Sequence, residues 1–128
     1  MKTYYLVLLF LVTHLINAQV SFTSPITQHF PSGELEIIER TITFDGKEFV
    51  IESKTSANKT HVQKWIVKEY SEMEFPIHGI SHFYVCESID SMYTTYILIP
   101  DINPIEYIEI IQPRQLIFDP KHVRFLVD

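Results

Sequence analysis

The sequence predicts an all-β protein, folded as an antiparallel sandwich or a small barrel of about seven strands. After Ala18 the chain holds 17 Ile, 7 Val and 8 Thr but only 4 Leu and one Ala. Branched side chains pack well on a pleated surface, whereas Leu and Ala favour helices. All seven prolines lie in the same part of the chain and divide it into short segments, which argues against long helices. Turn signals recur about every ten residues, as in sandwiches and barrels.

Residues 1–18 have the order of a secretory signal peptide. Lys2 provides a basic start, residues 4–16 are almost entirely apolar, and the small residue Ala18 marks a cleavage site. The apolar run is shorter than the roughly 20 residues that a membrane-spanning helix needs. We therefore expect cleavage after Ala18, no membrane insertion after that cleavage, and a single secreted or periplasmic β-rich domain over residues 19–128.

The clearest local unit is a hairpin over residues 36–55. Apolar and polar side chains alternate on both sides of Asp45-Gly46, and the alternation places Arg40 on the same face as Ile38 and Ile42. An Asp-Gly pair tolerates the positive φ angles of a tight turn. The pattern predicts two strands joined at Asp45-Gly46, with a loop over residues 56–59 after the second.

Residues 61–73 fit two interpretations. As a strand they alternate, with Trp65 and Val67 on one face. As a helix they form an apolar stripe, and Thr60 with Gln63 has the spacing of a capping box. The poor helix formers in this segment and the β character of its neighbours favour the strand. The alternative is an α+β fold with one helix around residues 61–73.

Further strands are expected after a connection at residues 75–79. Alternation and a high content of branched and aromatic residues predict strands over residues 81–88, 92–99, 105–112, 115–118 and 122–127. The first two of these form a second hairpin, and prolines separate the others. The last strand reaches almost to Asp128, so we expect the C-terminus to be tied into the sheet.

Composition limits the partners and cofactors. The chain carries 10 Lys and Arg against 16 Asp and Glu, a formal charge of −6. Nucleic acid is not expected as a partner, because binding it requires a surplus of basic residues. The chain has three glycines, too few for a phosphate-binding loop or a serine-hydrolase turn in this arrangement. No cofactor is expected.

Three candidate chemical sites lack a necessary part. His78 and His82 are four residues apart, but on a strand they would be about 13 Å apart, too far for one metal ion. Asp101 begins a segment like a calcium loop, but Pro104 follows where another ligand is needed. Cys86 is the only cysteine, and a lone cysteine is usually a small buried hydrophobic residue. We therefore predict no metal ligand and no catalytic residue.

Aromatic residues are the best candidates for a ligand site. Trp65, Tyr84 and Tyr93 combine a flat apolar face with a polar group, and His82 shares a strand face with Tyr84. We predict that these four residues contact a ligand. The competing interpretation is that they fill the core and pair across strands. Tyr93 and Tyr96 lie on opposite faces of one strand, so at most one of them lines a pocket.

These observations predict an exported β domain with a non-catalytic binding or structural role. Its partner would be a protein, a carbohydrate or a small-molecule ligand at the cell envelope or outside the cell. The alternative is a small secreted enzyme or enzyme inhibitor that uses His82, Tyr84 or Cys86. A third hypothesis is a subunit of a surface assembly, which an unpaired first or last strand at a sheet edge would support.

Overall fold

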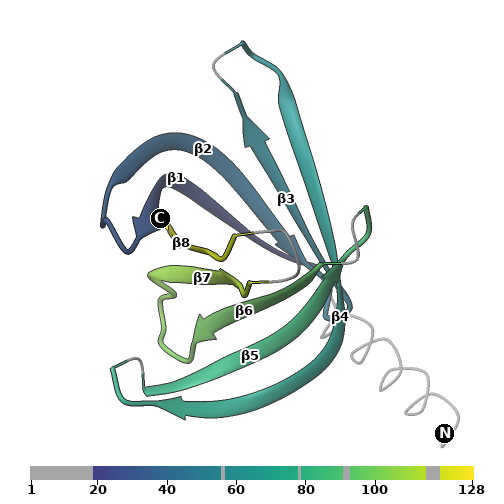
Figure 1. Cartoon of the computed structure of the whole chain (residues 1–128), viewed down its shortest axis with the longest axis vertical. Coiled ribbons are helices and arrows are strands. Elements are labelled where there is room, and N and C mark those ends of the chain that lie inside the picture. The colour runs from purple at the N-terminus through teal and green to yellow at the C-terminus, as the bar shows by residue number, and fades with distance from the viewer. Residues whose placement is uncertain (1–18, 56, 78, 91–92, 115–118) are drawn as a thin grey trace, which may run out of the picture.

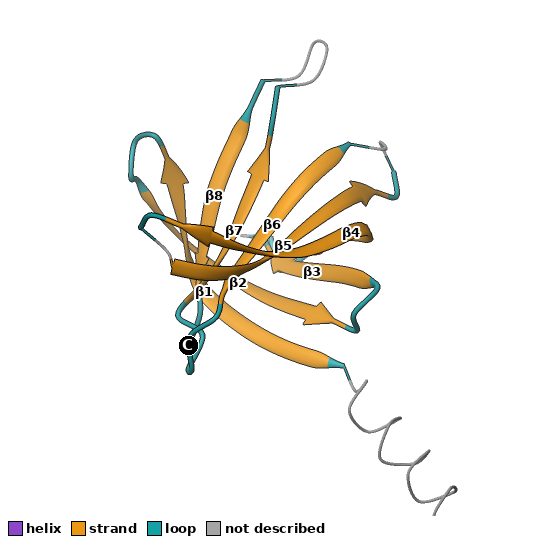
Figure 2. Cartoon of the chain, turned by 90° about the horizontal axis from the view of Figure 1, so that it is seen from below, coloured by secondary structure: helices purple, strands orange, loops and turns teal. Residues whose placement is uncertain are grey.

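The computed structural model describes residues 19–55, 57–77, 79–90, 93–114 and 119–128. In these residues eight antiparallel strands close into a barrel in sequence order, and the last strand pairs with the first (Figure 1). The strands are β1 (Val20–Phe30), β2 (Leu35–Phe44), β3 (Glu48–Lys54), β4 (Thr60–Phe75), β5 (Gly79–Ser88), β6 (Thr94–Pro100), β7 (Tyr107–Gln112) and β8 (Lys121–Leu126). Every described element is a strand or a connection (Figure 2), which confirms the prediction of an all-β sandwich or small barrel and selects the barrel. No helix in these ranges is long and apolar enough to cross a membrane.

The predicted hairpin around Asp45-Gly46 is present as β2 and β3. Phe44 pairs with Phe49 directly beside the turn. The Asp45 carboxylate accepts hydrogen bonds of 2.8 Å from the backbone N–H groups of Lys47 and Glu48. Gly46 has a φ of 94°, a conformation that costs glycine nothing and strains other residues. The local sequence therefore determines where this turn lies.

The ambiguous segment is a strand, and the helical alternative is wrong. β4 pairs with β3 along its first half and with β5 along its second half. The register with β5 shifts between Val67 and Glu69, and Figure 1 shows β4 bending along its length. A bulge of this kind adds a residue to one strand and bends it. Pairing with β3 or β5 along the whole strand outweighs the weak helical signals at Thr60 and Gln63.

β1 is a strand that the sequence pattern did not predict. Pro25 interrupts its alternation, and the register with β2 shifts between Ser24 and Ile26. Proline lacks an N–H donor, so strands accept it where the ladder is irregular. The strand predicted over residues 115–118 lies outside the described residues.

The C-terminal segment is tied into the sheet, as predicted. β8 pairs with β7 on one side and with β1 on the other. Beyond β8, the N–H of Val127 donates to the carbonyl of Glu106 at 2.9 Å, and the N–H of Asp128 donates to the carbonyl of Thr23 at 3.1 Å. Among the described strands the barrel leaves no unpaired first or last strand, so the feature that would have supported the surface-assembly hypothesis is not found there.

One end of the barrel interior is filled by aromatic rings. Phe44 stacks on Phe49 with ring centroids 4.1 Å apart, and Tyr84 meets both rings edge-on at 5.0 and 5.2 Å. Tyr70 lies against Tyr84 at 5.0 Å. We call this the aromatic end; the β2–β3, β4–β5 and β6–β7 connections belong to it. The opposite end, which carries the other connections, is called the open end.

Candidate functional site

A cavity lies inside the barrel toward the open end. This inner cavity has a volume of about 70 Å³ and is lined by Thr27, His29, Arg40, Gln63, Trp65, Ile110, Gln112, Lys121, Val123 and Phe125. An outer pocket of about 310 Å³ adjoins it at the open end. This pocket is lined by Gln63, Trp65, Ser88, Tyr93, Gln112, Pro113, Asp119 and Lys121. The two spaces share four lining residues, so they adjoin each other at the open end.

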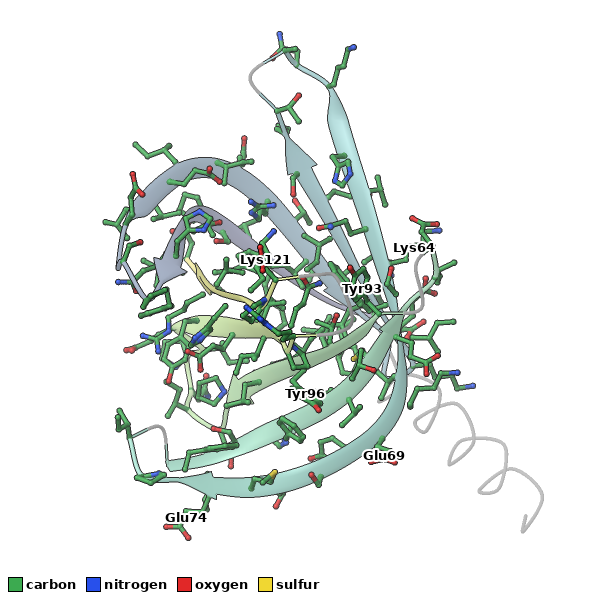
Figure 3. All side chains as sticks on the ribbon, in the orientation of Figure 1. Lys64, Glu69, Glu74, Tyr93, Tyr96 and Lys121 are labelled. Carbon is green, nitrogen blue, oxygen red and sulfur yellow. The ribbon has the colours of Figure 1, made fainter. Side chains whose placement is uncertain are left out.

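Strand alternation explains which side chains reach these two spaces. Residues two apart on a strand face the same side. On β4 this places Gln63 beside Trp65, and on β7 it places Gln112 beyond Ile110. On β8 the lining residue nearest the open end is Lys121. Figure 3 shows Lys121 and Tyr93 near the middle of the barrel, whereas Glu74 lies on β4 at the periphery.

Arg40 is a cation that lines the inner cavity. Its Nε donates a hydrogen bond of 3.0 Å to Oγ1 of Thr27, and its Nη1 donates to Oγ of Ser53. The guanidinium carbon lies 5.0 Å from the ring centroid of Phe125, a favourable cation–π distance. Burial lowers the pKa of Arg40, and the carboxylate of Glu36 opposes that shift. The cation stays charged, since arginine does not lose its proton in proteins.

Trp65 is fixed by a polar contact inside the barrel. Its indole Nε1 donates a hydrogen bond of 3.1 Å to Oγ1 of Thr95. Nε2 of Gln112 donates to the same oxygen at 3.3 Å. The side chain of Trp65 therefore cannot rotate without breaking a buried hydrogen bond. Its fixed ring lines both the inner cavity and the outer pocket.

Acidic residues lie at the rim rather than in the inner cavity. Glu36 lies 3.6 Å from Nη2 of Arg40 and 3.8 Å from Nε2 of His29, and its side chain is half exposed. Asp119 lines the outer pocket, 3.7 Å from the guanidinium of Arg114. None of the described residues lining the inner cavity is acidic. This interior is basic in a chain that is acidic as a whole.

The structure divides the four predicted ligand residues between the two ends. Trp65 and Tyr93 both line the outer pocket. Tyr84 belongs to the aromatic end, where burial raises the pKa of its phenol to about 12. His82 lies beside Tyr84 on β5, and its Nδ1 is 2.6 Å from the Tyr70 hydroxyl. The four residues therefore do not form one site.

Tyr93 and Tyr96 have different surroundings, and only one of them lines the outer pocket. Tyr93 lines the outer pocket. Tyr96 instead packs against Phe83, with ring centroids 5.3 Å apart. Of these two tyrosines, only Tyr93 is placed to contact a ligand in the outer pocket.

Cys86 lies in the buried core. Its exposed fraction is 0%, and burial raises the pKa of the thiol to about 12. A thiol with this pKa is protonated at neutral pH and is a poor nucleophile. In the part of the chain that the structure describes, no three His, Cys, Asp or Glu side chains gather as a metal site would require.

Several polar residues of the site were not among the predicted ligand residues, among them Arg40, Gln63, Gln112 and Lys121. One signal for Arg40 was present, because strand alternation placed this cation on the face of Ile38 and Ile42. A cation on an apolar face is unusual and indicates a special environment. No comparable signal marked the other three of these residues, because Gln112 and Lys121 are terminal residues of β7 and β8 and Gln63 lies among the mostly polar first residues of β4, where polar side chains are common.

Comparisons with protein-family models, with curated proteins and with solved structures each gave no match to this chain. The class of the protein therefore rests on its own geometry. It is a closed eight-stranded antiparallel barrel in its described residues, with an interior cavity that opens at one end.

Proposed function

We propose that this protein is an exported, non-catalytic barrel that binds a small ligand through its open end. The observation that carries this proposal is that the inner cavity and the outer pocket adjoin each other and share Gln63, Trp65, Gln112 and Lys121. Barrels of eight strands either fill their interior with side chains or hold one small ligand. Here the aromatic end is filled and the open end is not.

The size and lining of the outer pocket support a small ligand. Small-molecule sites usually occupy about 300–1,000 Å³ and combine apolar walls with a few polar groups. The outer pocket, at about 310 Å³, has the rings of Trp65 and Tyr93 as walls and the amides of Gln63 and Gln112 as polar groups. A protein partner would instead contact roughly 800 Å² of surface. A concave pocket inside a barrel favours the small molecule.

A binding role is favoured over catalysis by the placement of the reactive groups. Cys86 is buried away from solvent. His82 and Tyr70 form their hydrogen bond at the aromatic end, away from the cavity. A catalytic group must lie within reach of the substrate, and neither Cys86 nor the pair of His82 and Tyr70 meets this requirement at the open end.

Export is part of the proposal and rests on the order of residues in the first eighteen positions. The full chain with a C-terminal tag would be expressed in a bacterial host, and the intact mass of the exported protein would be measured. We expect a protein that begins at Gln19. As a control, Ala18→Arg should block the cleavage. An uncut chain that stays in the cytoplasm would contradict export without affecting the binding proposal.

Ligand binding is tested by NMR with ¹⁵N-labelled protein and a library of small fragments. We expect fragments that bind to shift the indole N–H of Trp65 together with the side-chain amides of Gln63 and Gln112. The side-chain amide of Gln28 serves as a control, because its neighbours Thr27 and His29 line the cavity and alternation turns Gln28 outward. Fragments that act only at the aromatic end, or none that reaches Trp65, would contradict the proposal.

A further inference from the structure

We infer that the ligand is a small organic carboxylate, whose acid group enters the inner cavity beside Arg40 while its apolar body occupies the outer pocket. This inference rests on the proposed binding function and names its ligand class. It starts from the charges that line the cavity. Arg40 and Lys121 are cations, His29 is a third basic residue, and no described lining residue of the inner cavity is acidic.

Arg40 has an N–H donor group that forms no hydrogen bond with the described residues. Its Nε and Nη1 donate to the hydroxyls of Thr27 and Ser53. Its Nη2 makes no hydrogen bond with any residue in the described ranges, and the carboxylate nearest to it, that of Glu36, is 3.6 Å away. The side chain of Arg40 is only 14% exposed. A desolvated cation of this kind gains strongly from a directly bonded anion.

Glu36 is a weak internal competitor for that position. Its side chain is 51% exposed, and it lies between Arg40 and His29 beyond hydrogen-bond distance of either. An ion pair at an exposed rim is screened by water and contributes little. A ligand carboxylate inside the cavity would meet the same guanidinium in a drier environment, so it can displace this pairing.

Space and shape favour a carboxylate. A cavity needs roughly 10–15 Å³ to hold one water, and the inner cavity offers about 70 Å³. That volume accepts a planar group of three heavy atoms, but not the body of the ligand. Guanidinium groups match the planar geometry of a carboxylate. The apolar part of the lining is formed by Ile110, Val123 and Phe125, and the ring of Phe125 lies 5.0 Å from the guanidinium carbon of Arg40.

The body of the ligand would lie against the rings of the outer pocket. Trp65 and Tyr93 line it together with Pro113. Lys121 lines both spaces and pairs with no acid among the residues that the structure describes. It therefore adds a second positive charge beside both spaces. The expected ligand is a carboxylic acid with a compact apolar or aromatic body.

The test compares three probes of one shape: phenylacetate, phenylacetamide and phenethylamine. Trp65 is the only tryptophan in the chain, so its fluorescence reports binding in the cavity. We expect phenylacetate to bind at least about tenfold more tightly than the amide, since a hydrogen bond to a charged group adds this much. The amine should bind more weakly than the amide, because Arg40 and Lys121 repel it.

Variants connect this selectivity to the inner cavity. Arg40→Lys keeps the charge but loses the forked donors, and should weaken phenylacetate binding about tenfold with little effect on the amide. Lys121→Gln should weaken only the carboxylate, by a smaller factor. Lys54→Gln is the matched control, because Lys54 is exposed and pairs with Glu39 at 3.4 Å. If Arg40→Lys fails to fold, Lys121→Gln retains the test.

The outcomes separate the inference from the function on which it rests. Equal binding of the three probes, with Trp65 responding to each, would overturn the carboxylate assignment and leave the binding function standing. Carboxylate selectivity that survives in both Arg40→Lys and Lys121→Gln would also overturn it. No response of Trp65 to any of the three probes would count against both proposals.

Discussion

The indole Nε1 of Trp65 donates a hydrogen bond of 3.1 Å to Oγ1 of Thr95, and this bond links β4 to β6 inside the barrel. Both residues are buried, with 4% and 0% of their surface exposed. Gln112 donates to the same hydroxyl oxygen from β7. Three strands thus meet at one hydroxyl beside the cavity, and the shape of the site depends on it.

Removing this contact should reduce stability and show coupling between the partners. Trp65→Phe loses the donor and part of the ring, and should lower the free energy of unfolding by about 1–3 kcal/mol. Thr95→Val keeps the shape but leaves the indole N–H unpaired, at a cost of about 1–2 kcal/mol. The double variant should lose less than the sum, as measured by urea unfolding followed with circular dichroism. Strictly additive losses would show that the hydrogen bond contributes nothing.

A buried acid on β7 should be needed for stability. Oε1 of Glu109 accepts hydrogen bonds of 2.9 Å from Nη2 of Arg124 and from Nε2 of His122, and Glu109 is 3% exposed. Glu109→Gln leaves a partly buried guanidinium without its anion, and should cost about 2–4 kcal/mol in urea unfolding.

The control for this substitution is Glu39→Gln, the same change in an exposed pair. Glu39 lies 3.4 Å from Lys54, and both side chains are largely exposed. The expected loss is below about 0.5 kcal/mol. Similar losses for Glu39→Gln and Glu109→Gln would contradict the assignment of Glu109 to a buried network.

Stability should fall in alkaline solution. Burial raises the pKa of Cys86 from 9.0 to about 12 and that of Tyr84 from 10.0 to about 12. The unfolded chain then releases these protons at lower pH than the folded chain, so the stabilisation is complete below the ordinary values and is lost as pH rises toward 12. Urea unfolding measured from pH 8 upward should show the decline, and Cys86→Ala and Tyr84→Phe should each reduce it.

The burial of Cys86 also has a direct chemical test. Ellman's reagent should label the thiol very slowly in the native protein and rapidly in concentrated urea. The same reagent at the same pH on Cys86→Ala gives the background. Rapid labelling of the native protein would contradict the buried position. It would show that the thiol of Cys86 is accessible for chemistry.

The β2–β3 turn should depend on the ionised form of Asp45. Backbone N–H donors from Lys47 and Glu48 lower the pKa of its carboxyl below 3.8. Asp45→Ala should cost about 1 kcal/mol at pH 7, and Asp45→Asn less, since an amide oxygen still accepts. Because the folded pKa is lowered, the difference between wild type and Asp45→Ala should persist above pH 3.8 and shrink as pH falls below it. A difference that does not change with pH would contradict the role of the charge.

Local patterns predict much of this fold because most of its strands carry a signal in their own residues. The alternation around Asp45-Gly46 predicts the hairpin, and the branched residues of β4 favour a strand over the helix. β1 escaped prediction because Pro25 falls at its register shift. Closure of the barrel, which pairs β1 with β8, joins the two ends of the described chain. No local pattern contains that information.

The candidate site is less predictable because it depends on closure. Trp65 and Tyr93 were identified from their chemistry and lie in the outer pocket. Tyr84 and His82 have the same chemistry, but strand direction takes them to the aromatic end. Gln112 and Lys121 become neighbours of Trp65 only when β7 and β8 close the barrel against β1. A residue's face follows from alternation, whereas its end of the barrel follows from topology.

The most direct test of the central claim is to locate a bound carboxylate. Intermolecular nuclear Overhauser effects would be measured between the ring and methylene protons of phenylacetate and the labelled protein. The proposed site predicts contacts of the ring protons with Trp65 and Tyr93, with the methylene protons, which adjoin the carboxylate, nearest to Arg40. Contacts confined to Phe44 and Tyr84 at the aromatic end, or to the outer surface of the barrel, would contradict a ligand site at the open end.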